Sequence, residues 1–186
     1  MDTSPIRLSR RNTFRAGGAG LAVLAGFQAQ VGSARQPGVS EVVQDFIAGW
    51  RALDADQIVQ TYASASRRED ITSPVVFQGR DEIRRSLLEF FAAFENATIE
   101  HPDILSGPSQ FAADTWIFTG DYVGTLPGLP SGNGQLLAIR GFTLIEVANN
   151  SIRRTVDYYD AYGLLVQLGA QPAFDPATPD ATPTHG

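Results

Sequence analysis

The hydrophobic pattern of this chain changes its period once, and that change restricts the possible folds more than any other feature. Between residues 40 and 94 apolar side chains recur at every third or fourth position, which predicts helices. Between residues 111 and 160 they alternate, which predicts strands. Helices followed by a meander of strands predict an α+β fold, with a curved antiparallel sheet and helices on its concave side.

The expected elements take their bounds from caps, turns and the ends of each periodic run. The predicted helices cover residues 40–53, the segment from Asp54 through Tyr62, and residues 80–94. The predicted strands cover residues 98–105, 111–125, 135–147 and 151–160, and residues 71–79 are expected to be extended. Asn149 and Asn150 tolerate positive φ, so we expect the turn between the last two strands there.

Composition excludes several kinds of chemistry. The chain has 186 residues, 43% of them hydrophobic, which is enough for one core, so we predict a single domain. It has no cysteine and no lysine, which excludes disulfides, thiolate ligands and Schiff bases. Its two histidines, His101 and His185, are too few for a histidine metal site, and we predict no metal and no cofactor. The net charge of −6, with no basic stripe, predicts that no nucleic acid is a partner.

The first 34 residues have the pattern of an export signal. Arg10 and Arg11 precede a weakly apolar stretch over residues 16–27, and small residues up to Ala34 are typical of a cleavage site. The paired arginines are similar to a twin-arginine signal. The alternatives are a membrane anchor or a disordered arm, but a membrane-spanning helix needs about 20 apolar residues. We therefore predict an exported protein with no stable membrane span after processing.

Residues 35–169 are then the folded domain, and residues 170–186 are a tail. The tail holds four prolines and shows no hydrophobic period, so we predict that it is disordered.

Three local motifs resemble those of one protein family. Residues 77–83 read FQGRDEI, residues 124–132 read GTLPGLPSG, and residues 163–169 read GLLVQLG shortly after Asp160. In this order and spacing they are similar to the SnoaL-like, polyketide cyclase-like branch of the NTF2-like superfamily. The resemblance implies a cone-shaped domain whose bent sheet wraps the helices and leaves a pocket for a small hydrophobic molecule. It also implies a homodimer that forms through the sheet.

Asp160 is the candidate acid/base residue, because the resemblance places the catalytic aspartate of the cyclases at this position. Strand alternation puts Asp160 on the same face as Val156 and Tyr158, which we expect to line the pocket. A carboxyl among apolar neighbours has a raised pKa, as a general base needs. The alternative is that Asp160 caps the short helix that follows it. A bulge in the strand would exchange its two faces and bring Asp157 into the pocket instead.

Further candidate site residues come from the strands and the second helix. Tyr158 and Tyr62 are expected to hold a developing enolate through their hydroxyl groups. The predicted pocket wall consists of Trp116, Phe118, Tyr122, Phe142 and Val156. The family commonly has tryptophan at the place of Val156 and histidine in the loop that follows Gly124, and this chain differs at both.

Arg140 and His101 each have two possible roles. Arg140 either faces the pocket and binds a carboxylate or enolate, or forms an outward ladder with Glu146 and Arg154. His101 either lies in the pocket beside a carboxylate or lies exposed at a loop edge before Pro102.

Two functions agree with these patterns. The first is a cofactor-free lyase, isomerase or cyclase in which Asp160 removes a proton next to the carbonyl group of a small apolar compound. The second is a non-catalytic exported domain that binds a hydrophobic molecule or dimerises.

Overall fold

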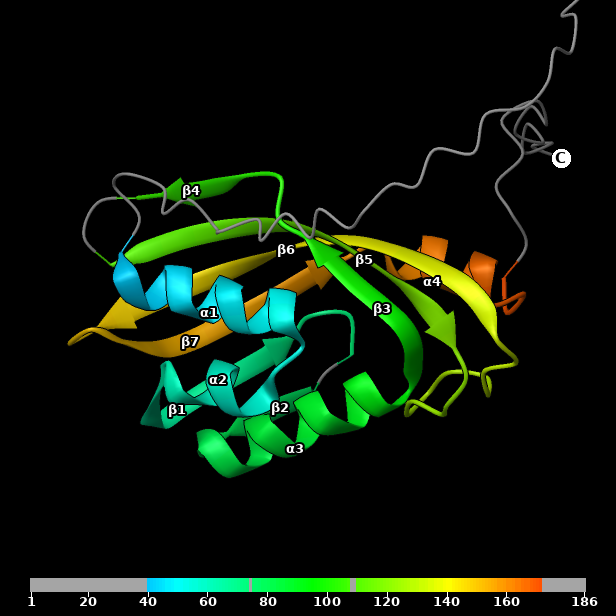
Figure 1. Cartoon of the computed structure of the whole chain (residues 1–186), viewed down its shortest axis with the longest axis horizontal. Helices are drawn as coiled ribbons and strands as arrows, with labels where there is room; N and C mark the ends of the chain where they lie inside the picture. Colours follow the sequence, from blue (N-terminus) through cyan, green and yellow to red (C-terminus); the bar gives the residue numbers. More distant parts are fainter. Residues whose placement is uncertain (1–39, 74, 108–109, 172–186) are drawn as a thin grey trace, which may run out of the picture. The chain divides into compact units, whose positions relative to one another are not determined.

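The computed structural model describes residues 40–73, 75–107 and 110–171, which form four helices and a curved sheet (Figure 1). The predicted signal over residues 1–34 and the tail from residue 172 onward lie outside the described residues. The helices are α1 (Glu41–Ala52), α2 (Ala55–Gln60), α3 (Gly79–Ala92) and α4 (Ala161–Gln167). The strands are β1 (Tyr62–Asp70), β2 (Val75–Gln78), β3 (Phe94–Glu100), β4 (Ile104–Ser106), β5 (Phe111–Tyr122), β6 (Gln135–Ala148) and β7 (Ser151–Tyr159).

The sheet confirms the predicted α+β fold, with one difference in strand direction. Its order is β2-β1-β7-β6-β5-β3, and β4 pairs with β5 beside β3. Every pairing is antiparallel except that of β1 with β7, which is parallel, so the sheet is mixed. Helices α1 and α3 lie on the same side of the sheet (Figure 1).

Tyr62 begins a strand, and its predicted place in the second helix is wrong. Helix α2 starts at its cap, Asp54, whose side chain accepts a hydrogen bond from the Gln57 amide at 2.9 Å. It ends at Gln60, and the Thr61 carbonyl oxygen then accepts a bond from the Ile152 amide in β7 at 2.8 Å. Strand β1 carries few apolar residues, so it has no hydrophobic alternation to reveal it.

The core consists of two clusters at opposite ends of the concave face. The first joins α1 and α2 to the sheet through residues such as Phe46, Ile58 and Ile145. The second joins α4 to the sheet through Phe118, Ile139 and Leu164. Along β5 and β6 the cavity-lining residues between these clusters are Asp114, Trp116 and Thr143, so polar and aromatic side chains separate the two clusters there.

A bulge near the start of β7 decides which side chains of that strand face inward. Glu146 pairs with Arg154 and Val147 pairs with Ile152, so Arg153 is an extra residue in β7. Ile152 belongs to the first core cluster. Beyond the bulge the odd-numbered residues face inward. This confirms the prediction that a bulge in this strand would turn Asp157 toward the pocket.

No helix in the described part of the chain combines the length and the apolar character needed to cross a bilayer.

Candidate functional site

A cavity of about 490 Å³ lies between the concave face of the sheet, helix α3 and the loop after β5. Its walls are mostly apolar and include Trp50, Phe90, Trp116, Phe118 and Leu164. This volume falls in the range of sites that bind small molecules, about 300–1,000 Å³.

Polar side chains cross the cavity wall as one row over four neighbouring strands. Asp114 in β5 pairs with Thr143 in β6, Thr143 pairs with Asp157 in β7, and Asp157 pairs with Asp70 in β1. Residues in register on adjacent strands point to the same face of a sheet. The four side chains all line the cavity, and they lie between the two apolar clusters of the core.

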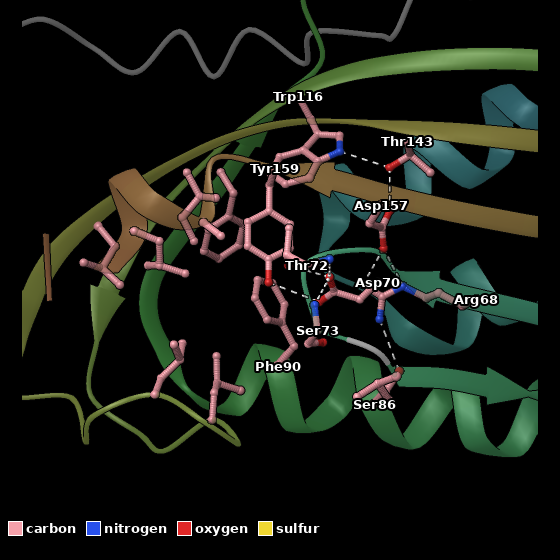
Figure 2. A pocket seen from close by; sticks show the side chains of 18 of the residues that line it. Arg68, Asp70, Thr72, Ser73, Ser86, Phe90, Trp116, Thr143, Asp157 and Tyr159 are labelled. Carbon is pink, nitrogen blue, oxygen red and sulfur yellow. Dashed lines mark hydrogen bonds and ion pairs between the residues drawn. The ribbon is translucent and has the colours of Figure 1, made fainter. Parts of the chain in front are cut away.

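The middle of this row is a continuous chain of hydrogen bonds (Figure 2). The Trp116 indole Nε1–H donates to Thr143 Oγ1 at 3.0 Å, and the Thr143 hydroxyl donates to Asp157 Oδ1 at 2.7 Å. Arg68 donates to Asp157 Oδ2 from Nε at 2.9 Å, and its Nη2 lies 2.8 Å from the same oxygen. Asp157 is therefore paired in charge and bonded on both oxygens.

Arg68 contacts four other residues that line the cavity: Asp157, Ser86, Trp50 and Phe77. Its side chain is 16% exposed, and its Nη1 donates to Ser86 Oγ at 3.3 Å. The guanidinium carbon lies 5.7 Å from the Trp50 ring centroid and 6.0 Å from that of Phe77. Burial opposes the charged form, but the Asp157 carboxylate and its neighbours more than offset burial and raise the pKa of Arg68.

Asp114, at the β5 end of the polar row, forms a buried pair with His101 in the cavity wall. His101 Nδ1 lies 2.7 Å from Asp114 Oδ2, and both side chains are 1% exposed. Burial raises the pKa of Asp114, although the hydrogen bond from His101 opposes that rise. His101 Nε2 and Asp114 Oδ1 are buried and have no hydrogen-bond partner within the described residues.

Gly141 makes room for the tryptophan of the bonded chain. Gly141 lies in register between Trp116 and Tyr159, whose ring centroids are 6.5 Å apart. A Cβ atom at position 141 would overlap the Trp116 ring and the Tyr158 carbonyl oxygen. The indole can therefore lie across β6 only because position 141 has no side chain.

Tyr159 connects the cavity to the turn after β1. Its hydroxyl donates to Asp70 Oδ2 at 3.2 Å, while Asp70 Oδ1 accepts from the amides of Thr72 and Ser73 at 2.9 and 3.2 Å. Burial raises the pKa of Tyr159, so this phenol remains a hydrogen-bond donor at neutral pH.

The structure places Asp160 outside the cavity. Its side chain caps α4 by accepting a hydrogen bond from the Gly163 amide at 2.7 Å, which is the capping alternative stated above. The face assignment made from simple alternation is wrong beyond Arg153, because the bulge there exchanges the two faces. Asp157, three positions earlier, lines the cavity in its place.

Three more predicted site residues share the outer face with Asp160. Phe142 stacks on Tyr158 with ring centroids 4.7 Å apart and an angle of 7° between the ring planes. Together with Arg140 these residues border a shallow surface depression on which Asp160 also lies. Of the predicted ladder, Glu146 and Arg154 do lie in register on β6 and β7, but Arg154 donates its hydrogen bonds to Glu69 at 2.7 Å.

The remaining predicted residues are buried or, for Trp116, half-buried, and two of them reach the cavity. Trp116 and Phe118 line it, as expected. Tyr62 lies in the first core cluster, where its hydroxyl is 2.7 Å from Thr155 Oγ1 and burial raises its pKa. Tyr122 lies in the second cluster, where its hydroxyl accepts from the Leu126 amide at 2.9 Å. Val156 is 1% exposed and is not part of the cavity lining.

Sequence reasoning missed Arg68 and Asp114 and left His101 and Asp157 as alternatives. His101 is buried beside a carboxylate, so the exposed loop-edge interpretation is wrong. Asp114 and Arg68 lie in strands whose inward positions include polar residues. The partner of each is far away in sequence, and only strand pairing brings Arg68 to Asp157 and Asp114 to His101. Among the described residues, no three histidine, aspartate or glutamate side chains are grouped so that they could hold a metal ion.

The comparisons with known proteins agree with this architecture. A model of the SnoaL-like polyketide cyclase family matches residues 40–168. A SnoaL-like polyketide cyclase family protein from a Jannaschia species has a TM-score of 0.63 and 16% identity, with 76% of this chain and 100% of that chain covered. No curated protein sequence matches this chain.

Two further solved structures have the same fold. TsrD from Streptomyces laurentii has a TM-score of 0.61 and 20% identity, with 70% of this chain and 93% of that chain covered. A hypothetical protein with a ketosteroid isomerase-like fold from Catenulispora acidiphila, solved with trimethylamine, has a TM-score of 0.58 and 19% identity. Its alignment covers 74% of this chain and 100% of that chain. At these identities the likeness establishes the fold alone.

The architecture, a curved sheet with helices and a cavity on its concave side, is that of the NTF2-like fold. Because the family model spans most of the chain, the protein belongs to the SnoaL-like polyketide cyclase family.

Proposed function

We propose that the domain is a cofactor-free acid/base enzyme, a lyase, isomerase or cyclase, that acts on a small and mostly apolar carbonyl compound. The observation that carries this proposal is the His101–Asp114 pair, which is buried in an apolar cavity with His101 Nε2 unpartnered. A carboxylate that accepts the Nδ1–H fixes the neutral tautomer of the imidazole, and Nε2 is then the proton acceptor.

The reaction step follows from that tautomer. His101 Nε2 takes a proton from the carbon next to the carbonyl group, the C–H bond breaks, and its electron pair forms an enolate. The Tyr159 hydroxyl, which remains protonated, then gives up its hydrogen bond to Asp70 and donates to the enolate oxygen instead. Protonation of the enolate carbon, attack on a second carbonyl group or loss of a leaving group completes an isomerase, cyclase or lyase reaction.

Asp157 has a different part in this proposal from the one predicted for Asp160. Its carboxylate is bonded to Arg68 and Thr143 and neutralises the guanidinium charge. A carboxylate so engaged is a poorer base than an imidazole with a free nitrogen. We therefore assign to Asp157 the positioning of Trp116 and Arg68 in the cavity wall.

The test measures proton exchange directly. The full-length protein is incubated in D2O with a panel of apolar ketones, each with and without a hydroxyl group, and mass spectrometry follows deuterium incorporation next to the carbonyl group. For the ketone that exchanges fastest, His101→Gln is expected to lower the exchange rate by about 10²–10⁴-fold, as loss of a general base does. Glutamine can still donate a hydrogen bond to Asp114, so the fold should remain.

Asp160→Asn is the matched comparison, because asparagine caps helices as well as aspartate does. It is expected to leave exchange unchanged. Full exchange in His101→Gln, or a loss confined to Asp160→Asn, would contradict the assignment to His101.

The alternative is a non-catalytic binding domain, and one observation favours it. The chain from Trp116 to Arg68 satisfies its hydrogen bonds within the protein, as a purely structural network would. Ligand binding without deuterium exchange across the whole panel would support this alternative.

Two further parts of the proposal rest on the sequence alone. We propose that the protein is exported, because of the signal pattern in residues 1–34, and mass analysis of its amino terminus in cell fractions tests this. We also propose that it forms a homodimer through the outer face of the sheet, which sedimentation tests.

A further inference from the structure

Two buried polar atoms in the cavity wall have no hydrogen-bond partner within the described residues. They are His101 Nε2 and Asp114 Oδ1, and both residues line the cavity. An unpaired buried polar group destabilises a protein by about 1–3 kcal/mol, so such atoms usually meet water or a ligand.

Both open atoms accept hydrogen bonds. When the His101 Nδ1–H donates to Asp114 Oδ2, Nε2 keeps a free lone pair. Asp114 Oδ1, as part of a carboxylate, is also an acceptor. A ligand group that meets Asp114 Oδ1 must therefore carry hydrogen on oxygen or nitrogen, in addition to the carbonyl group of the proposed substrate.

The charge of the cavity wall restricts the ligand in a second, independent way. Arg68 is the one arginine among the described lining residues, and its charge is already bonded to Asp157. The lining also contains the carboxyl groups of Asp70, Asp114 and Glu89. An anionic ligand would find no unpaired cation there and would lie among carboxylates.

We infer that the cavity takes a non-anionic molecule with an apolar body and an O–H or N–H donor that binds at Asp114 Oδ1, beside the His101 Nε2 that the proposed reaction uses as its base. The inference rests on the proposed function in that it names the ligand class of the same site. An alcohol and a protonated amine both supply the donor, and the aromatic walls suit the apolar body of either.

Intrinsic fluorescence provides the measurement. The chain has two tryptophans, Trp50 and Trp116, and both line the cavity, so quenching or a spectral shift reports its occupation. Four probes share one bicyclic skeleton and differ in a single group: indane, 2-indanol, 2-aminoindane and indane-2-carboxylate. Each is titrated into the full-length protein at neutral pH.

We expect 2-indanol, 2-aminoindane or both to bind about tenfold more tightly than indane, the factor that one satisfied buried group supplies. Indane-2-carboxylate is expected to bind more weakly than indane. Comparison of the alcohol with the amine shows which donor the site prefers. Tightest binding of the carboxylate, equal binding of indane and both donors, or no binding of any probe would overturn the inference.

Variants locate the effect. Asp114→Asn replaces an acceptor oxygen with a donor and is expected to reduce the advantage of the donor probes over indane to less than threefold. Asp121→Asn is the matched control: Asp121 lies on the same strand but faces the other way and bonds to Asn96. An equal loss in both variants would contradict the placement of the donor at Asp114.

The two proposals fail in different ways. Donor-selective binding without any deuterium exchange would refute the acid/base function and leave the ligand class intact. Deuterium exchange together with binding of the carboxylate probe in preference to the donors would refute the ligand class and leave the acid/base function intact.

Discussion

The last strand and the turn after it place two aspartates only three positions apart in opposite environments. The Asp157 side chain is 9% exposed, lines the cavity and binds Arg68 and Thr143. Asp160 is exposed and caps a two-turn helix through the Gly163 amide. The residue that matches a family motif by its position is thus the structural one, and its neighbour faces the site.

The two tyrosines between them differ in the same way. Tyr159 faces inward, where its hydroxyl donates to Asp70. Tyr158 faces outward and stacks on Phe142. One extra residue at Arg153 causes both reversals, because it shifts the alternation of every residue that follows. The choice of the face of β7 that lines the cavity is therefore made at Arg153, seven positions before Asp160.

The largest expected difference between the two faces is in stability. Asp157→Asn leaves the buried Arg68 guanidinium without its counter-charge and should lower the free energy of unfolding by about 3–5 kcal/mol. Asp160→Asn keeps the cap and should change it by less than about 0.5 kcal/mol. Urea denaturation followed by circular dichroism measures both.

A second substitution checks the cause of that loss. Adding Arg68→Met to Asp157→Asn removes the unpaired charge and should recover part of the lost stability. Equal losses in the two single variants, or a double variant less stable than Asp157→Asn alone, would contradict the burial of this ion pair.

The fold could be predicted from the sequence, but the face of β7 that lines the cavity could not. Periodicity located α1, α3 and the three long strands, and the closing motif gave α4 with its cap as one of two alternatives. Strand β1 was missed because its inward positions include Arg68 and Asp70, so the polar wall itself removed the alternation by which strands are found. Polar residues that line a cavity interrupt the hydrophobic pattern from which strands are predicted, so prediction often fails at such places.

The His101–Asp114 pair was hidden for a different reason. His101 precedes Pro102 after a strand, which is typical of an exposed loop, and nothing in the local sequence names its partner. Asp114 lies 13 positions later, across the pairing of two strands. Contacts of this kind depend on register, and a one-residue slip would move every side chain to the other face.

A smaller difference is expected between two threonines on opposite faces of the same strand pair. Thr143→Val keeps the shape of the side chain but leaves the Trp116 indole N–H without an acceptor and removes a donor from Asp157. It should lower the free energy of unfolding by about 1–3 kcal/mol. Thr119→Val removes the exposed bond to Thr98 and should cost less than about 0.5 kcal/mol.

Urea denaturation of the two valine variants gives this comparison its sharpest form, since the chemical change is identical. If Thr119→Val were as harmful as Thr143→Val, the hydrogen-bonded chain behind the cavity would contribute nothing beyond the general cost of losing a hydroxyl group.

The smallest expected effect is on the outer face, where Phe142 stacks on Tyr158 although 41% of Phe142 is exposed. In a monomer Phe142→Ala should lower the free energy of unfolding by about 0.5–1.5 kcal/mol, the range of an aromatic pair, and should leave binding of the indane probes unchanged. If the outer face joins two copies, the same substitution should also raise the dimer dissociation constant measured by sedimentation, and the loss of stability should depend on protein concentration. A loss that does not vary with concentration would place the stack outside any dimer contact. A change in probe binding would show that the two faces of β7 are not independent, against the separation of roles argued for Asp157 and Asp160.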